Sequence, residues 1–194
     1  MYTELKFSIP ELKGISKKSV DEHLKLYSGY VKHANLILDK IQEYAKDSEK
    51  NAYVLGELQR RFGFEFDGMR NHEYYFKSLE GGSNSLPTDS LFKTQVEKQF
   101  GSWDAWLVQL KSIALMRGIG WAITYWDPIA KRLTNAWIEE QHLGHLNSLQ
   151  YVVGIDMWEH SYYMDYGTDK KKYVEAFFEN LNWNVIEENF KNAQ

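Results

Sequence analysis

The sequence predicts an α+β protein, in which an N-terminal antiparallel helical hairpin is followed by an α/β half. Apolar residues recur at helical spacing through two long segments, and the breaker-rich run of residues 81–87 then ends this pattern. Beyond the run, short segments rich in β-branched and aromatic residues alternate with further helical segments. We therefore expect an N-terminal helical hairpin domain over residues 1–85 and a C-terminal α/β domain over residues 86–194.

The hairpin follows from two helical patterns. Ser16 is a start signal for the first, which we expect over residues 16–47, with apolar residues on one face throughout. The second pattern runs over residues 51–79, and its glycines predict an interruption at residues 63–68. Two such helices followed by a linker form an antiparallel hairpin.

The second half mixes helices and strands. Residues 89–116 are again helical, with a break at Gly101 after which Ser102 or Asp104 can cap the next helix. Three strands are expected, at residues 118–126, 133–139 and 151–156. Further helical segments extend from the third strand to the end of the sequence.

The composition restricts the chemistry of any site. The chain has 194 residues, of which 43% are hydrophobic, so it can bury a substantial core. It contains no cysteine, which excludes disulfides, thiolate zinc sites, iron–sulfur clusters and cysteine nucleophiles. Any metal ion must therefore be held by nitrogen and oxygen atoms.

The charge and the distribution of apolar residues bear on partners and location. A net charge of −4 predicts no nucleic acid partner and no anionic membrane surface, since both require a basic face. No segment approaches the roughly 20 apolar residues of a membrane-spanning helix. Residues 1–11 lack the unbroken apolar stretch of a secretory signal, so we expect a cytoplasmic protein.

Asp156 and His160 form the most informative pair. An aspartate at the end of a predicted strand and a histidine four residues later, in the first turn of a helix, can converge on one point. Imidazole and carboxylate ligands suit manganese, iron or zinc. Taken alone, the two residues also fit a helix cap and a core histidine.

Two further histidines lie on the predicted hairpin. His72 stands on a helix face crowded with aromatic residues, and His23 has Tyr27 and Tyr30 one and two turns further along its helix. Each histidine alone also fits a hydrogen-bonded core residue. His33 and His145 we interpret as structural or surface histidines.

Several blocks of residues stand in a familiar order. They are a histidine on the first helix, Asn71-His72 followed by aromatics, Phe100-Gly101-Ser102, Gly118–Ala122, Asp156–Tyr163 and Asn182-Trp183. The chain thereby resembles the iron/manganese superoxide dismutase family over nearly its whole length, and the string Asp-x-Trp-Glu-His-x-Tyr-Tyr is highly specific. The resemblance implies a three-stranded antiparallel sheet in the α/β domain.

The resemblance also implies an activity and a site. The activity is conversion of superoxide to dioxygen and hydrogen peroxide by redox cycling of one manganese or iron ion per subunit; zinc, which has no redox chemistry, is disfavoured. The implied metal ligands are His23, His72, Asp156 and His160. Trp121 and Trp158 match aromatic residues that wall the site. The alternative is a catalytically impaired metal-binding dimer with the same fold.

Further residues of the site are implied in the same way. Glu159 and Tyr163 match residues that reach a neighbouring subunit, so we expect a homodimer, with a tetramer as the other possibility. Lys170 falls where the family usually has an arginine near the substrate funnel. It either steers superoxide by its positive charge or belongs to a solvated lysine run.

An amide side chain that bonds to solvent on the metal is expected from the C-terminal domain. Iron enzymes of the family often carry a glutamine four residues before the second-helix histidine, but this chain has Gly68 there. Gln141, ahead of the Asp-x-Trp motif, fits the manganese-like arrangement, in which a glutamine from the C-terminal domain bonds to solvent on the metal. His142 is the other candidate, and Gln141 also fits a solvated loop amide.

The first helix departs from the family pattern. The family has a histidine four residues after the first ligand and a gateway tyrosine eight residues after it, whereas here Tyr27 and Tyr30 stand four and seven residues after His23. An extra residue in a helix makes a π-bulge, and deleting it restores a regular helix. Our hypothesis is that Tyr30 keeps the gateway role while Tyr27 replaces the histidine, whose hydrogen bond across the dimer interface to Tyr163 of the neighbouring subunit the Tyr27 hydroxyl can still make.

Overall fold

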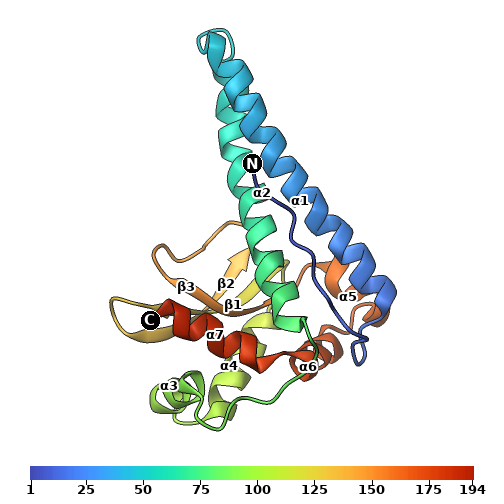
Figure 1. Cartoon of the computed structure of the whole chain (residues 1–194), viewed down its shortest axis with the longest axis vertical. Coiled ribbons are helices and arrows are strands. Elements are labelled where there is room, and N and C mark those ends of the chain that lie inside the picture. Colours follow the sequence, from blue (N-terminus) through green and yellow to red (C-terminus); the bar gives the residue numbers. More distant parts are fainter.

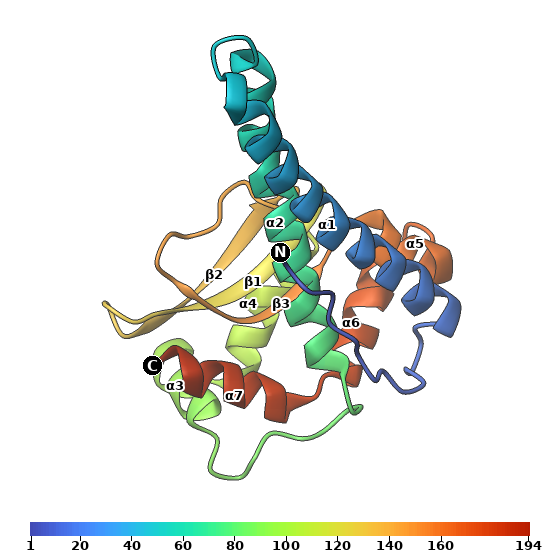
Figure 2. The same cartoon turned by 45° about the horizontal axis from the view of Figure 1, so that its top comes forward.

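The structure is a computed structural model that describes all 194 residues. Its fold is α+β, as predicted. Helices α1 (Lys17–Tyr44) and α2 (Ala52–Leu79) form the antiparallel hairpin, joined by the short 3₁₀ helix η1 (Ala45–Asp47). The far part of the hairpin stands away from the rest of the molecule (Figure 1), and the turned view shows the same arrangement (Figure 2). The remaining helices and a three-stranded sheet gather around its near part.

Helix α1 begins and continues as its sequence predicts. Ser16 is the N-cap, and its hydroxyl accepts a hydrogen bond from the Ser19 N–H at 3.1 Å. Its buried positions recur every three or four residues and face α2; they are Ser19, His23, Tyr27, Val31, Ala34 and Ile37. The helix contains no π-bulge, so His23 and Tyr30 stand on a regular α-helix.

The interruption predicted in α2 is wrong, because the helix is continuous through residues 63–68. A glycine costs a helix about 1 kcal/mol relative to alanine, which is a local and modest penalty. Packing of α2 against α1 offsets it. At Gly68 the missing side chain is what allows the approach, since a Cβ there would lie 2.6 Å from the Tyr30 ring.

The sheet contains β1 (Gly120–Asp127), β2 (Arg132–Glu139) and β3 (Gln150–Asp156) in the order β2-β1-β3, and both pairings are antiparallel. Central strand β1 is buried on both faces. On one face Trp121 packs against His72 of α2. On the other, Thr124 accepts a hydrogen bond from the Trp106 indole.

Gly120 is required where β1 begins, because its φ is +129° and a Cβ would lie 2.0 Å from the Ile138 carbonyl oxygen.

Five helices complete the second half: α3 (Leu91–Phe100), α4 (Trp103–Ala114), α5 (Glu159–Tyr166), α6 (Lys170–Asn180) and α7 (Trp183–Ala193). The predicted break between α3 and α4 is present, with Gly101 left-handed at φ +85° and the Ser102 hydroxyl capping α4. Helix α5 follows β3 directly and packs against α1. This brings the end of the sheet to the hairpin.

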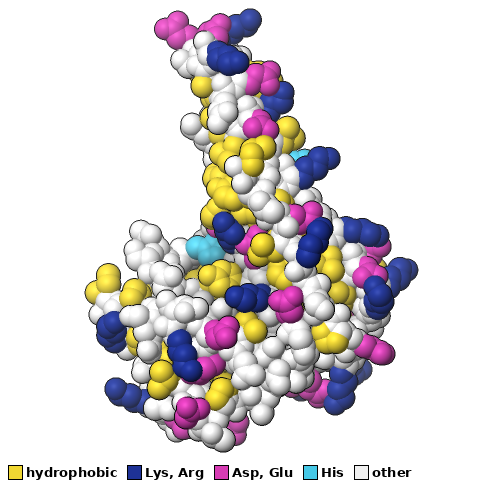
Figure 3. Space-filling model, in the orientation of Figure 1, with side chains coloured by type: hydrophobic (Ala, Val, Ile, Leu, Met, Phe, Trp, Pro, Cys, Tyr) yellow, Lys and Arg dark blue, Asp and Glu magenta, His cyan; other side chains and the backbone are white.

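The surface of the hairpin changes along its length. Charged side chains gather at its tip, whereas apolar side chains lie along its middle (Figure 3). Tyr53, near the tip, is 89% exposed. None of the helices combines the length and the apolar character that crossing a membrane requires.

Candidate metal centre

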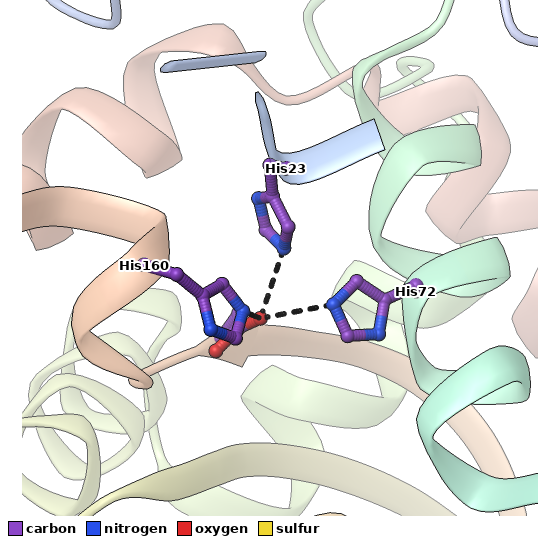
Figure 4. A group of neighbouring side chains, drawn as sticks. His23, His72 and His160 are labelled. Atoms are coloured by element: carbon purple, nitrogen blue, oxygen red, sulfur yellow. Dashed lines mark hydrogen bonds and ion pairs between the residues drawn. The ribbon is translucent and has the colours of Figure 1, made fainter. Parts of the chain in front are cut away.

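Four side chains from four elements meet between the hairpin and the sheet. His23 comes from α1, His72 from α2, Asp156 from the end of β3 and His160 from α5. One ligand atom from each lies within 4.8 Å of all the others. Figure 4 shows the three imidazoles pointing toward one carboxylate oxygen. The motif pair therefore converges as predicted and is joined by both hairpin histidines.

The distances centre on Asp156 Oδ2. His23 Nε2 and His160 Nε2 each lie 3.1 Å from this oxygen, and His72 Nε2 lies 3.5 Å from it. Asp156 and His72 are fully buried, and His23 is 3% exposed. The second carboxylate oxygen, Oδ1, accepts a hydrogen bond from the Trp158 N–H at 2.8 Å, which fixes the orientation of the carboxylate.

His72 indicates that a cation belongs at this point. Its Nδ1–H donates to the Gly68 carbonyl one turn earlier in α2, so its Nε2 carries a lone pair. This Nε2 is buried and has no hydrogen-bond partner. It faces the Asp156 carboxylate oxygen, and two lone pairs facing each other in a buried place are unfavourable unless a positive ion lies between them.

The protonation states suit the same interpretation. Burial, reinforced by the neighbouring histidines, lowers the pKa of His72 from 6.5 to about 3. Burial also lowers the pKa of His23, although Asp156 opposes this. For Asp156 burial favours the protonated form, but charge and hydrogen bonds from His160 and His23 prevail and hold its pKa well below 3.8. The buried ligands are thus deprotonated at neutral pH, as metal binding requires.

Aromatic rings enclose the ligands. The centroid of the Trp121 ring lies 5.1 Å from that of the His72 ring, and the centroid of the Tyr30 ring lies 5.0 Å from it. Trp158 stacks on His160 at 6.0 Å between ring centroids. The two tryptophans named from the sequence therefore lie against His72 and His160.

Gln141 joins two of these rings. The buried amide accepts from the Trp121 indole through Oε1 at 2.9 Å and donates to the Tyr30 hydroxyl through Nε2 at 3.0 Å. His142 instead packs against Phe64 and leaves its buried Nδ1 without a partner. Of the two candidates, Gln141 is the one whose side chain bridges the rings beside His72.

Tyr30 takes its place because α2 has no side chain at residue 68. Three atoms of the Tyr30 ring lie within 3.0 Å of the position that a Cβ of Gly68 would occupy. Burial, followed by the negative charges of Asp156 and Glu65, raises the pKa of the Tyr30 hydroxyl above its usual value. The hydroxyl therefore keeps its proton at neutral pH.

Within one chain, the Tyr27 hydroxyl bonds to two other residues of the hairpin domain. The hydroxyl accepts a hydrogen bond from the Leu5 N–H at 2.8 Å and donates to Glu73 Oε1 at 3.2 Å. Both partners lie outside the ligand group. Burial raises the pKa of Tyr27 to about 12, so this hydroxyl also stays protonated. In the chain, Tyr27 ties the N-terminal segment to the hairpin.

Helices α5 and α6 carry the remaining sequence-predicted residues. Glu159 is exposed and Tyr163 is 58% exposed, so both point away from the core of the chain. Lys170, the first residue of α6, donates from Nζ to the Gly118 carbonyl at 2.7 Å. Burial lowers the pKa of Lys170, against the influence of Glu159.

The sequence did not indicate a role for His145 or Tyr125, which lie next to the backbone of Gln141 and next to each other. His145, interpreted as a structural or surface histidine, lies 3.1 Å from the Gln141 carbonyl through Nε2 and 2.7 Å from the Tyr125 hydroxyl through Nδ1. No motif or spacing marks either residue. His33 is exposed, in agreement with its interpretation as a surface histidine.

The chain is similar to known superoxide dismutases. Residues 87–189 match the family described as "Iron/manganese superoxide dismutases, C-terminal domain". The "Superoxide dismutase [Fe]" of Aquifex pyrophilus is 35% identical over 187 residues, which cover 94% of this chain and 87% of that protein. The "Superoxide dismutase [Fe]" of Cupriavidus metallidurans is 35% identical over 177 residues, covering 89% and 87%. The "Superoxide dismutase [Mn/Fe]" of Propionibacterium freudenreichii is 31% identical over 179 residues, covering 89% and 86%.

Proposed function

The chain belongs to the iron/manganese superoxide dismutase family, and on this premise we propose that it converts superoxide to dioxygen and hydrogen peroxide. One iron or manganese ion is held by His23, His72, Asp156 and His160, whose ligand atoms lie within 4.8 Å of one another. The names of the relatives include both metals, so the proposal covers both.

The observation that carries the proposal is the lone pair on His72 Nε2. It is buried, lacks a hydrogen-bond partner and faces a carboxylate oxygen 3.5 Å away. A histidine kept only for packing would not need this arrangement, because burying a polar atom without a partner costs about 1–3 kcal/mol.

The chemistry divides between the ion and the chain. One-electron exchange with superoxide, which gives dioxygen in one half-reaction and hydrogen peroxide in the other, is what a bound iron or manganese ion supplies. The chain contributes three imidazoles and one carboxylate, which leave a di- or trivalent ion with net positive charge and so favour an anionic substrate. Trp121 and Trp158 limit the access of water.

We propose that Tyr30 and Gln141 control protons beside this centre. Tyr30 holds a proton on its hydroxyl oxygen, and the Gln141 amide orients that hydroxyl through the 3.0 Å bond from Nε2. The Trp121 indole fixes the other end of the amide at 2.9 Å. Through these two hydrogen bonds the amide affects the reduction potential of the metal ion without binding the ion itself.

The activity test uses the purified full-length chain loaded separately with iron and with manganese. We expect about one ion per chain by elemental analysis and superoxide dismutation by pulse radiolysis with at least one metal. His72→Ala is expected to lose most of the metal and the activity, whereas His33→Ala, at an exposed histidine, keeps both. Full occupancy without turnover for either metal would sink the proposal and leave the impaired metal-binding dimer.

We further propose that the chain works as a homodimer in which α5 lies at the interface. The exposed Glu159 and the 58% exposed Tyr163 support this. Light scattering is expected to give twice the chain mass of 22.9 kDa, and Tyr163→Arg to shift it toward the monomer while Tyr53→Arg does not. A monomeric wild-type chain would contradict the proposal; a mass of four chains would indicate the tetramer.

Three sequence expectations enter as proposals. The division into residues 1–85 and 86–194 is supported by the family match, which begins at residue 87. Steering of superoxide by Lys170 is tested by the salt dependence of kcat/KM in Lys170→Gln, which should be weaker than in the unmodified chain. A cytoplasmic location without a nucleic acid or membrane partner rests on the sequence arguments, and cell fractionation tests the location.

A further inference from the structure

Gln141 sits in a tight loop that follows β2. Glu139 and Leu143 pair across this loop, with N–H to carbonyl distances of 2.9 and 3.1 Å. Glu140, between them, has a left-handed φ of +53°. Backbone pairing closes the base of the loop but does not hold residue 141 itself, so side-chain contacts must fix the position of Gln141.

The Gln141 carbonyl receives two such contacts. Asn71 Nδ2 of α2 donates to it at 3.0 Å, and His145 Nε2 lies 3.1 Å from it. The other nitrogen of His145, Nδ1, is 2.7 Å from the Tyr125 hydroxyl of β1. His145 Nε2 also lies 3.3 Å from Asn71 Nδ2, but the Gln141 carbonyl oxygen is nearer, at 3.1 Å. We therefore place the imidazole proton on Nε2, where it is donated to the Gln141 carbonyl, while Nδ1 accepts from the Tyr125 hydroxyl. Neither nitrogen is left to bind a metal ion.

We propose that His145, supported by Tyr125, is a positioning residue that holds Gln141 so that its amide spans Trp121 and Tyr30. This inference rests on the proposed role of Gln141 at the metal centre. The amide is fully buried, and its contacts of 2.9 and 3.0 Å lie on opposite ends of one planar group. A backbone shift of about 1 Å would lengthen at least one of them beyond hydrogen-bonding distance.

The contact to Asn71 does not make His145 redundant. Asn71 approaches from the hairpin, whereas Tyr125 anchors His145 to the central strand of the sheet. The two donors therefore fix the Gln141 carbonyl relative to both parts of the molecule that supply metal ligands. Losing the His145 donor leaves the Gln141 carbonyl bonded to Asn71 of α2 alone.

The first readout is a spectrum that does not depend on turnover. In the ¹⁵N-labelled, metal-free full-length chain, the Trp121 indole N–H resonance, assigned with Trp121→Phe, reports the bond to Gln141 Oε1. We expect His145→Leu to shift this resonance upfield and speed its exchange with solvent. His145→Gln, which keeps a donor near the Nε2 position, should restore it, and His33→Leu should leave it unchanged.

The second readout is turnover per bound metal. For His145→Leu we expect a fall of about tenfold or more with unchanged metal content, in the range typical of lost outer-shell partners. Tyr125→Phe, which removes only the hydroxyl, should give a smaller change of the same kind in both readouts. This milder variant decides the question if His145→Leu does not fold.

Two outcomes separate this inference from the role of Gln141. If Gln141→Leu lowers turnover while His145→Leu and Tyr125→Phe match the unmodified chain in both readouts, the positioning role is wrong and the role of Gln141 stands. If Gln141→Leu itself leaves turnover unchanged, the proposed role of Gln141 fails and the inference falls with it.

Discussion

Gly68 and Tyr30 show how the absence of one side chain determines the place of another. A Cβ at residue 68 would lie 2.6 Å from the Tyr30 ring, so Gly68→Ala must displace this ring. We expect Gly68→Ala to break the bond between Tyr30 and Gln141 and to lower turnover about tenfold, without loss of metal. Pulse radiolysis with elemental analysis measures both quantities.

Gly56 provides the matched control, since it lies in the same helix and a Cβ there would meet nothing within 4 Å. Gly56→Ala should leave turnover unchanged and raise the free energy of unfolding by about 0.5–1 kcal/mol. Equal turnover in the two alanine variants would contradict the steric role of Gly68.

His72 makes the stability of the metal-free chain depend on pH. Its imidazole takes up a proton near pH 6.5 in the unfolded chain, whereas burial lowers the folded pKa to about 3. Between these values the unfolded chain binds the additional proton, so stability is present above pH 6.5 and is lost as the pH falls toward 3. The contribution is about 1.4 kcal/mol per pH unit for one proton.

Urea unfolding of the metal-free chain at pH 6, 5 and 4 tests this dependence. His72→Gln should reduce the slope of the unfolding free energy against pH by about one proton, because the titrating group is gone. His33→Gln, at an exposed histidine, should keep the slope of the unmodified chain. A His72→Gln chain with that same slope would contradict the assignment.

Among the elements, α3 depends on a carboxylate from α7. Glu187, which is 2% exposed, accepts from the Ser90 hydroxyl at 2.6 Å and from the N–H groups of Leu91 and Phe92 at 3.0 and 3.2 Å. These groups lie at the N-terminus of α3, where backbone donors otherwise lack partners. Glu187→Ala should therefore lower the free energy of unfolding by about 1–3 kcal/mol.

Chemical denaturation measures this loss. Glu188→Ala is the control, since the neighbouring carboxylate is exposed and forms no hydrogen bond or ion pair. Its effect should stay within about 0.5 kcal/mol. If both variants unfold at the same denaturant concentration, Glu187 does not stabilise α3.

The elements were predictable from local patterns, whereas some of their contacts were not. The helices and strands lie within a few residues of their predicted ranges because hydrophobic periodicity, caps and breakers are local signals. The expected interruption of α2 was wrong because the cost of a glycine is local, while the packing that offsets it comes from α1.

The residues of the site also divide into those that the sequence could predict and those whose contacts it could not. Asp156 and His160 could be predicted together because they are four residues apart in one motif, and the family pattern supplied both hairpin histidines. The partners of Tyr27 lie 22 and 46 residues away, at Leu5 and Glu73, and helical spacing says nothing about either. The contacts of His145 are likewise tertiary.

At the scale of the whole molecule, a bound metal ion connects the two parts of the chain. His23 and His72 belong to the hairpin, while Asp156 and His160 belong to the part that contains the sheet. Metal at 100 times its Kd stabilises the folded chain by about 2.7 kcal/mol. This corresponds to a rise in Tm of roughly 5–10 °C for a chain of this size.

Calorimetry of the metal-free and manganese-loaded chain checks this rise. His160→Gln, at the least buried ligand, should fold but show a smaller metal-dependent rise in Tm. His33→Gln should show the full rise. An equal rise in His160→Gln and the unmodified chain would mean that the ion stabilises the chain from another position.

The contact between Gly68 and Tyr30 also has an evolutionary consequence. With Tyr30 in its present place, residue 68 cannot gain a side chain unless the tyrosine first moves, so the effect of a substitution on α2 depends on the state of α1. The two helices are thus subject to epistasis. A substitution that is harmless in α2 when residue 30 is small is therefore harmful when residue 30 is tyrosine.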